Sequence, residues 1–265
     1  MRFTVFGLGE AGSPIAADLA QAGADVHGFD PADVETPPGV IRHREASSAA
    51  ARADLVLAVT AASDARLAMD QAWTEIGPGA LYADLSTAAP GLKQDLAATA
   101  DHKGVRFADV ALMAPVPGRG LSTPALASGT GASDLARRVN VLGGRVEAIG
   151  DRAGQAAGRK LLRSVVTKGL SSLLIESLEA GRAADDLPWL WEHLVDQLTT
   201  LDRAFLERML EGTLVHVDRR LVEMEAAREH LHALGVEADM TQAVIARLRR
   251  IREEGLGGLE KLAHD

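Results

Sequence analysis

The chain has 265 residues and a formal net charge of -9, with 47% hydrophobic and 25% charged residues. This composition is typical of globular proteins with one large domain or two ordinary ones, and the acidic balance argues against non-specific nucleic-acid binding, which requires basic surface. The absence of cysteine excludes disulfides, thiolate nucleophiles and cysteine metal sites.

The sequence also lacks the patterns of membrane and secreted proteins. No segment approaches the roughly 18 consecutive apolar residues of a membrane span, and the first residues follow a strand pattern rather than that of a signal peptide. His230 and His232 would point to different sides of a helix and do not make a metal pair. We therefore expect a cytoplasmic protein without a metal, a membrane or a nucleic-acid partner.

A glycine-rich turn separates the first predicted strand, residues 2–6, from the first predicted helix, residues 13–23. Gly7, Gly9 and Gly12 have the G-x-G-x-x-G spacing. The first glycine permits the tight turn, the second lets the backbone approach a pyrophosphate, and the third lets the helix pack closely. The helix N-terminus also attracts phosphates. The predicted dinucleotide contacts in this turn are Gly7, Leu8, Gly9, Glu10, Ala11 and Gly12.

The second predicted strand, residues 25–30, ends in an acidic residue. Asp30 lies about 18 positions after Gly12, close to the spacing of a ribose-binding acid. A carboxylate there accepts hydrogen bonds from both ribose hydroxyls of NAD and repels the 2′-phosphate of NADP. Arg42 and Arg44 are the nearby cations that would favour NADP instead. The alternative for Asp30 is an ordinary turn residue at a strand end.

Strand and helix patterns then alternate to residue 149, which predicts an α/β domain of the Rossmann type. The predicted strands are 40–43, 54–60, 80–85, 106–113, 125–129 and 145–149, and the predicted helices are 45–52, 63–76, 90–100 and 133–142. Val59 and Thr60, Ser86 and Thr87, and Pro115 and Val116 follow strand ends. Because ligands bind beyond the carboxyl ends of such strands, we expect Val59 and Thr60 to contact the cofactor. These residue types are also common in plain turns.

A long helix is predicted over residues 154–179. Its leucines and valines form a wide apolar face. A polar stripe on another face consists of Lys160, Ser164, Thr167, Lys168 and Ser171. The stripe either faces a cleft between two domains or is simply solvated. We place the boundary here, with a dinucleotide-binding domain at residues 1–152 and an all-helical domain for substrate binding and dimerisation at residues 153–265.

After this helix the strand signals stop. Helical periodicity predicts helices over residues 187–211, 215–234 and 239–254, with Asp239 or Thr241 as a cap, and a frayed tail from residue 255. The apolar faces of these helices are too extensive for a small isolated bundle. Their largest side chains are Trp189, Trp191 and Phe205. We therefore expect a homodimer that packs through these helices.

Four motifs together resemble the β-hydroxyacid dehydrogenases, which include 3-hydroxyisobutyrate and 6-phosphogluconate dehydrogenases. VFGLGEAGSPIAADL resembles the opening pattern of that superfamily, DLST at residues 84–87 its substrate motif, APV followed by Gly118 its APVSGG loop, and GQAAGRK the segment leading to its catalytic lysine. The pattern G-x-A-x-x-x-K…TKG at residues 154–169 is similar to a branch of phosphogluconate-dehydrogenase-like proteins whose C-terminal helical domain has no assigned function.

The resemblance implies a dehydrogenase that transfers a hydride between NAD, or NADP, and a small hydroxyacid or related carbonyl. It implies that Lys160 is the general acid/base and that Ser86 and Thr87 bind the substrate. Lys168, two turns further along the helix, is the alternative proton donor or a second substrate contact. A lysine can serve near neutral pH if burial or a nearby cation lowers its pKa. Otherwise Lys160 is an ordinary surface lysine.

Three positions depart from the pattern of the well-studied dehydrogenases. Arg119 replaces the second glycine of the APVSGG loop, Pro117 replaces its serine, and Arg163 stands where those enzymes have an asparagine three residues after the lysine. Arg119 or Arg163 would instead pair with an anionic substrate. Imine reduction on the same scaffold and a catalytically silent dinucleotide-binding protein are the alternative functions.

Overall fold

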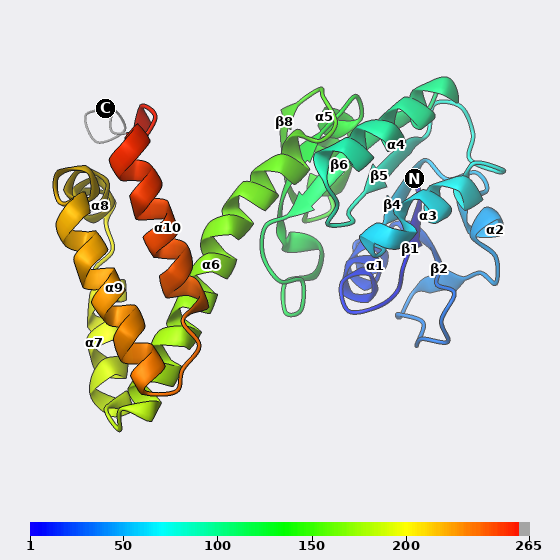
Figure 1. Cartoon of the computed structure of the whole chain (residues 1–265). Coiled ribbons are helices and arrows are strands. Elements are labelled where there is room, and N and C mark those ends of the chain that lie inside the picture. Colours follow the sequence, from blue (N-terminus) through cyan, green and yellow to red (C-terminus); the bar gives the residue numbers. More distant parts are fainter. Residues whose placement is uncertain (260–265) are drawn as a thin grey trace. The chain divides into compact units, whose positions relative to one another are not determined.

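The structure, a computed structural model, describes residues 1–259 and is shown in Figure 1. It divides into two compact units, residues 1–163 and residues 164–265. Most of the expected frayed tail, residues 260–265, lies outside the described residues. No helix in the described part of the chain is long and apolar enough to cross a membrane.

The first unit is built on a mostly parallel sheet, and this confirms the predicted α/β fold. Among the described residues the sheet has eight strands in the order β3-β2-β1-β4-β5-β6-β7-β8. β7 is antiparallel to β6, and the other neighbours are parallel. The strands are β1 Arg2–Phe6, β2 Asp25–Phe29, β3 Val40–Arg42, β4 Leu55–Ala58, β5 Leu81–Asp84, β6 Arg106–Leu112, β7 Pro124–Ser128 and β8 Arg145–Gly150.

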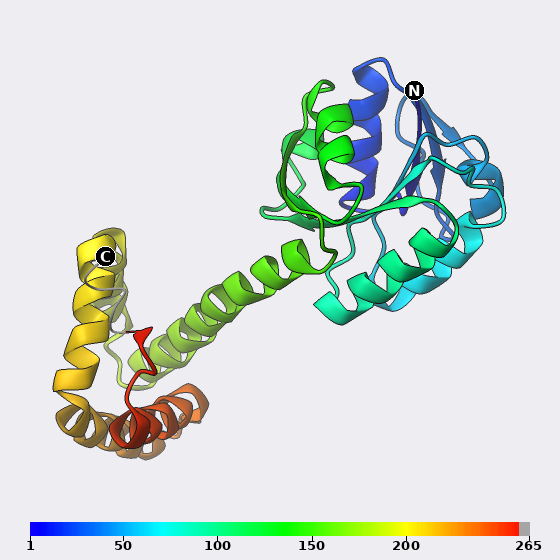
Figure 2. The same ribbon diagram turned by 90° about the horizontal axis from the view of Figure 1, so that it is seen from above.

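Helices cover both faces of this sheet (Figure 2). One apolar core joins the sheet to α1 (Gly12–Gln21) and α5 (Ala132–Asn140). A second core joins the other face to α2 (Ala46–Ala50), α3 (Ala65–Ala72) and α4 (Pro90–His102). Burial on both faces explains why the strands read as continuous apolar runs. The predicted helix 63–76 is in fact a 3₁₀ turn, Ala62–Asp64, followed by the shorter α3.

The long predicted helix is present as α6, Gln155–Ala183, with 29 residues. It ends where Asp186 N donates to Gly181 O at 2.8 Å. The division between the two units falls within α6, between Arg163 and Ser164. The domain boundary proposed at residue 152 remains a prediction.

The prediction of one helix over residues 187–211 is wrong. Two helices occupy this segment, α7 (Leu187–Thr199) and α8 (Arg203–Val215). The Thr200 hydroxyl donates back to Gln197 O at 2.9 Å, and the Asp202 carboxylate accepts from Phe205 N at 2.7 Å. A threonine that bonds its own turn and an aspartate N-cap end one helix and start the next.

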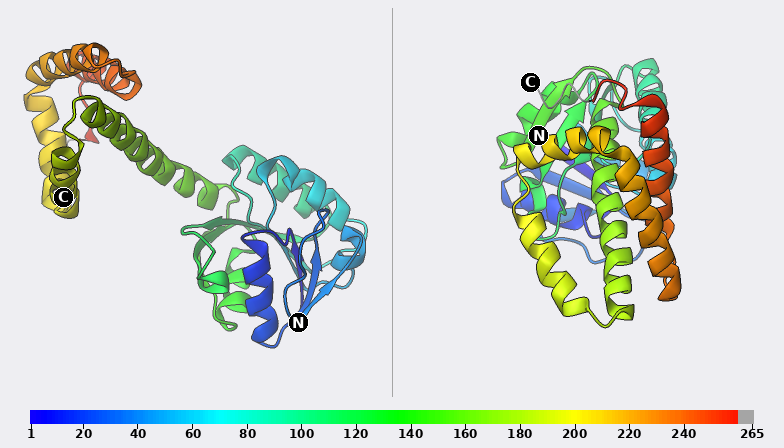
Figure 3. Two further views of the ribbon diagram at one scale, coloured as in Figure 1. Left: turned by 90° about the horizontal axis from the view of Figure 1, so that it is seen from below. Right: turned by 60° about the vertical axis from the view of Figure 1, so that its left-hand side comes forward.

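The last two helices, α9 (Val217–Ala233) and α10 (Asp239–Glu254), lie side by side (Figures 1 and 3). A small core between them is centred on Leu221, Ile245 and Leu248. The expected cap of α10 comes from elsewhere. No side chain of its own N-cap serves, and Glu176 of α6 accepts hydrogen bonds from Met240 N at 2.6 Å and Thr241 N at 2.9 Å.

Helices α7 and α8 leave several of their apolar side chains exposed within this single chain. No residue of either helix is buried. Trp189 is 62% exposed and Trp191 is 53% exposed. Surfaces of this kind mark contacts with another molecule in soluble proteins.

Candidate functional site

The residues predicted to bind the cofactor and the substrate follow the carboxyl ends of adjacent strands. The glycine turn follows β1, Asp30 follows β2, Val59 and Thr60 follow β4, and Thr87 comes shortly after β5. These four strands are parallel neighbours. Their carboxyl ends therefore meet along one edge of the sheet, where ligands of open α/β folds bind.

Two of the three glycines in the turn are required by close backbone packing. Gly7 has φ +85°, and a Cβ there would lie 2.2 Å from Val59 O. A Cβ on Gly12 would lie 1.8 Å from Gly7 O. Only glycine therefore allows α1 to pack against β1 and β4 in this way.

The third glycine faces open space. A Cβ on Gly9 would have no heavy atom within 4 Å. A pocket of about 410 Å³ lies beside it, lined by Gly7, Gly9, Asp30, Val59 and Thr60 together with Phe6, Phe29, Pro31, Ala61, Asp64, Leu67, Ala68 and Gln71. The turn thus leaves room for a ligand where the G-x-G-x-x-G pattern places the pyrophosphate.

Asp30 is held at the rim of this pocket by backbone donors. Its Oδ2 accepts from Leu8 N at 2.7 Å and its Oδ1 from Ala32 N at 2.8 Å. Each carboxylate oxygen has further lone pairs for a ribose hydroxyl. Arg42 orders the loop after β2 by donating to Asp30 O, Ala32 O and Val34 O at 2.8–3.0 Å. Its guanidinium is therefore already engaged with the backbone.

The polar groups of the pocket are also compatible with a bound dinucleotide. Thr60 lines the pocket, and its Oγ1 is a buried hydroxyl with no hydrogen-bond partner in the described part of the chain. Residues Asp64, Leu67 and Gln71 of the segment after β4 also line it and were missed from the sequence. Glu10 and Ala11 do not line it, and the side chain of Leu8 belongs to the core.

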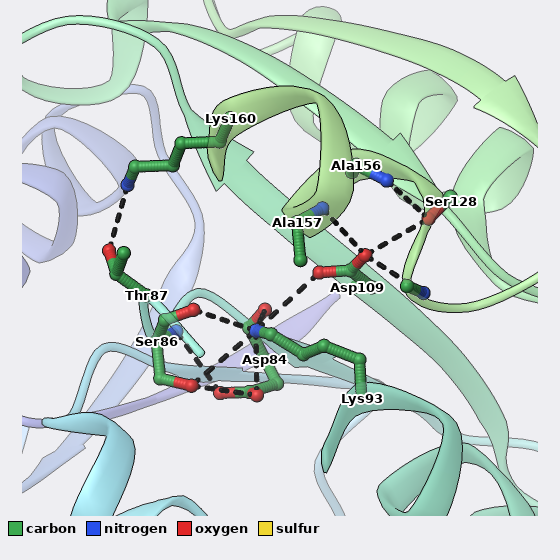
Figure 4. Close-up of polar contacts among 10 residues, drawn as sticks. Asp84, Ser86, Thr87, Lys93, Asp109, Ser128, Ala156, Ala157 and Lys160 are labelled. Atoms are coloured by element: carbon green, nitrogen blue, oxygen red, sulfur yellow. Dashed lines mark hydrogen bonds and ion pairs between the residues drawn. The ribbon is translucent and has the colours of Figure 1, made fainter. Parts of the chain in front are cut away.

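Lys160 and Thr87 meet beyond the end of β5, although 73 residues separate them (Figure 4). Lys160 Nζ donates to Thr87 Oγ1 at 2.8 Å. Thr87 is exposed and Lys160 partly buried. The structure therefore brings a predicted proton donor and a predicted substrate-binding hydroxyl into one polar site.

Ser86, by contrast, is only 3% exposed. Its hydroxyl donates to Asp84 Oδ2 at 2.9 Å, and its N–H donates to Asp84 Oδ1 at 3.1 Å. The DLST motif thus turns Ser86 inward and Thr87 outward.

Beneath this turn lies a buried charged cluster that the sequence analysis missed (Figure 4). Lys93 of α4 is 0% exposed, and its Nζ donates to Asp84 Oδ2 at 2.8 Å and to Ser86 O at 2.7 Å. Asp109 of β6 is also fully buried, with Oδ1 3.5 Å from Lys93 Nζ. Its Oδ2 accepts from Gly154 N and Ala157 N at the start of α6. The sequence does contain an indication of this cluster. Asp109 is a charged residue inside an apolar strand, and a buried charge needs a partner.

The predicted anion-binding arginines make none of the hydrogen bonds described above. Arg163 NH1 donates to Met113 O, just after β6, at 2.6 Å. Arg119 is exposed in the loop after β6. Lys168 belongs to the second unit, and its part in a site remains a prediction. No group of three or more metal-binding side chains occurs among residues 1–259.

Two family models match the chain. Residues 2–121 match the NAD binding domain of 6-phosphogluconate dehydrogenase. Residues 182–251 match a domain of unknown function. The two matches lie on either side of the segment that contains Lys160.

The chain is also similar to curated relatives. A probable 3-hydroxyisobutyrate dehydrogenase of Mycobacterium bovis is 32% identical over an alignment of 141 residues, and the match covers 51% of this chain and 48% of that protein. The chain therefore spans about half the length of the curated relatives it matches.

Solved structures extend the likeness in fold to nearly the whole chain. A conserved hypothetical protein from Sinorhizobium meliloti 1021 is 26% identical with TM-score 0.62, covering 99% of this chain and 95% of that one. An imine reductase variant from Myxococcus stipitatus in complex with NAD⁺ is 21% identical with TM-score 0.79, covering 97% and 95%. The chain thus carries an NAD-binding domain of the 6-phosphogluconate dehydrogenase type at residues 2–121 and, at residues 182–251, a domain of a family whose function is unknown.

Proposed function

We propose that this protein is an NAD(P)-dependent oxidoreductase of the β-hydroxyacid dehydrogenase type, which acts on a small hydroxyacid or related carbonyl compound with Lys160 as the general acid/base. The observation that carries the proposal is the 2.8 Å hydrogen bond between Lys160 Nζ and Thr87 Oγ1. This pair lies at the sheet edge that also bears the glycine turn and the pocket beside it.

Each residue of the site has a separate role in the proposed reaction. The bound nicotinamide supplies the hydride chemistry. Gly7 and Gly9 line the pocket for the dinucleotide, Gly12 lets α1 pack closely behind the turn, and Asp30 accepts hydrogen bonds from the ribose hydroxyls. Thr87 orients the substrate's oxygen by a hydrogen bond, and Lys160 gives or takes the proton at that oxygen. The hydrogen bond between Lys160 and Thr87 supports this assignment because it keeps both groups within reach of one substrate atom.

The first experiment is a substrate screen. Hydroxyacids, aldehyde acids and cyclic imines are offered with NAD⁺ or NADH, and the absorbance of NADH is followed. We expect turnover in the hydroxyacid or aldehyde-acid group. Turnover with imines alone would favour imine reduction, which the likeness in fold to an imine reductase makes the second candidate. Cofactor binding by fluorescence with no turnover in any group would favour a silent binding protein.

Asp30 sets the cofactor preference in this proposal. We expect NADH to bind more tightly than NADPH, and Asp30→Ser to shift the ratio of the two Kd values toward NADPH by about 10-fold, the loss of one charged hydrogen bond. Titration of cofactor fluorescence measures both values. Asp33→Ser is the matched control, since Asp33 is an exposed acid of the same loop. Tighter NADPH binding by the unmodified protein would contradict the role of Asp30.

We also propose that the protein is a homodimer packed through its C-terminal helices. Trp189 and Trp191 are exposed in the single chain, and α7 and α8 have no buried residue. A second copy would cover this apolar surface, as symmetric association commonly does. Light scattering at micromolar concentration should give about twice the 27.9 kDa of one chain. A mass of one chain at that concentration would rule the dimer out.

A further inference from the structure

A fully buried lysine connects the two segments that carry the proposed catalytic pair. Lys93, Asp84 and Asp109 are each 0% exposed. Asp84 and Asp109 stand opposite one another on the adjacent strands β5 and β6. Two carboxylates so placed repel one another unless a cation lies between them. Lys93 supplies that cation, with Nζ 2.8 Å from Asp84 Oδ2 and 3.5 Å from Asp109 Oδ1.

On the side of β5, Lys93 fixes the turn that presents Thr87. Its Nζ donates to Ser86 O at 2.7 Å and to Asp84 O at 3.0 Å, in addition to the Asp84 carboxylate. These carbonyls belong to residues one and three positions before Thr87. The ammonium therefore restrains the backbone of the turn itself, and not only one side chain.

On the side of β6, Asp109 fixes the first turn of α6. Its Oδ2 accepts from Gly154 N and Ala157 N, each at 3.0 Å. Ser128 donates its hydroxyl to the same oxygen at 3.1 Å and accepts from Ala156 N at 3.0 Å. A carboxylate is favoured at a helix N-terminus by the free N–H groups and the helix dipole.

These contacts and the hydrogen bond between Lys160 and Thr87 form a closed ring, which Figure 4 shows. Lys160 lies three residues after Ala157, about one helical turn. We infer that Lys93 is a positioning residue for the proton-transfer step: it joins the Thr87 turn to the first turn of α6 and so holds Lys160 Nζ at Thr87. The inference rests on the proposed function, because it concerns the geometry of the same pair.

The test uses two variants of the full chain. Lys93→Met removes the ammonium and keeps most of the stem, but leaves two buried carboxylates unpaired. The double variant Lys93→Met/Asp84→Asn also removes one carboxylate, so its cluster has the same net charge as the original, -1 in both. The double variant therefore distinguishes the loss of the positioning contacts of Lys93 from the effect of an added unpaired charge in the interior. Lys103→Met is the matched control, because Lys103 is an exposed lysine just after α4.

Three quantities are measured on folded protein. The kcat should fall about 10²-fold in both Lys93 variants, the usual cost of a small misplacement of reacting groups. The Kd of NADH should stay within about twofold, because the dinucleotide pocket lies at β1, β2 and β4. Hydrogen exchange at Gly154, Ala156 and Ala157 should accelerate. Lys103→Met should leave all three quantities unchanged.

A folded double variant with unchanged kcat and unchanged exchange at the start of α6 would overturn the inference. If Lys93→Met does not fold, the double variant carries the test alone. Failure of the proposed function gives a different pattern. Lys160→Met would then retain turnover, while the Lys93 variants would still accelerate exchange at Gly154 and Ala157, and this result would support the link and reject only the proton transfer.

Discussion

Replacement of Lys160 by methionine is expected to lower turnover by about 10²- to 10⁴-fold, the usual contribution of one general acid/base. Methionine keeps the length of the stem and removes the ammonium that donates to Thr87 Oγ1 at 2.8 Å. NADH binding should stay nearly unchanged, because Lys160 does not line the pocket beside the glycine turn. Steady-state kinetics on the substrate identified by the screen, together with cofactor titration, measures both effects.

Lys168→Met is the comparison for this experiment. It removes the same group from the same helix, α6. A smaller loss than that of Lys160→Met is expected if Lys168 only influences the charge around the site. A larger loss would mean that Lys168 is the proton donor. Turnover at the original rate in a folded Lys160→Met variant would reject the mechanism for Lys160.

The parts of the fold that were predicted correctly depend on local sequence. The glycine turn lies between a strand and a helix that are both visible in the periodicity, and the spacing of its glycines can be read directly from the sequence. The buried strands read as apolar runs because helices cover both faces of the sheet. Asp30, predicted from the spacing of the motif to bind the ribose, lines the pocket beside the turn. Its contact with a ribose remains a prediction.

The buried cluster could not be derived in the same way. That Asp84 and Asp109 face one another depends on the register of β5 and β6, which the sequence leaves open until the strand order is known. Lys93 lies in a predicted helix, and nothing in the sequence distinguishes it from an exposed helical lysine, since lysine is rarely buried. In retrospect, the aspartate within the apolar strand Arg106–Leu112 was the available signal.

The C-terminal helices illustrate a second limit. The break between α7 and α8 comes from Thr200 and Asp202, whose side chains bond to nearby backbone groups. Hydrophobic periodicity does not reveal such bonds, because the apolar positions continue on both sides of the break. The cap of α10 is likewise supplied by Glu176, 65 residues before Thr241. A local motif cannot anticipate a partner at that distance.

Two substitutions in the glycine turn are expected to distinguish a loss of stability from a loss of cofactor binding. Gly12→Ala tests stability. Gly12→Ala is expected to lower the free energy of unfolding by about 3 kcal/mol, a large overpacking cost, because its Cβ would lie 1.8 Å from Gly7 O. Neither backbone can yield without moving α1 away from β1. Thermal unfolding should show a Tm lower by about 6–12 °C, and NADH affinity should fall along with stability.

Gly9→Ala is the matched control for packing and should behave in the opposite way. Nothing lies within 4 Å of its added Cβ, and Gly9 is not among the glycines with positive φ. We therefore expect the Tm to stay unchanged. The methyl group would project toward the space beside the pocket, where the backbone must approach the pyrophosphate, so NADH should bind about 10- to 100-fold more weakly. Unchanged NADH affinity in Gly9→Ala would mean that the dinucleotide does not approach this turn. A stable Gly12→Ala would mean that α1 and β1 can separate at little cost, and the packing role of Gly12 would then be wrong.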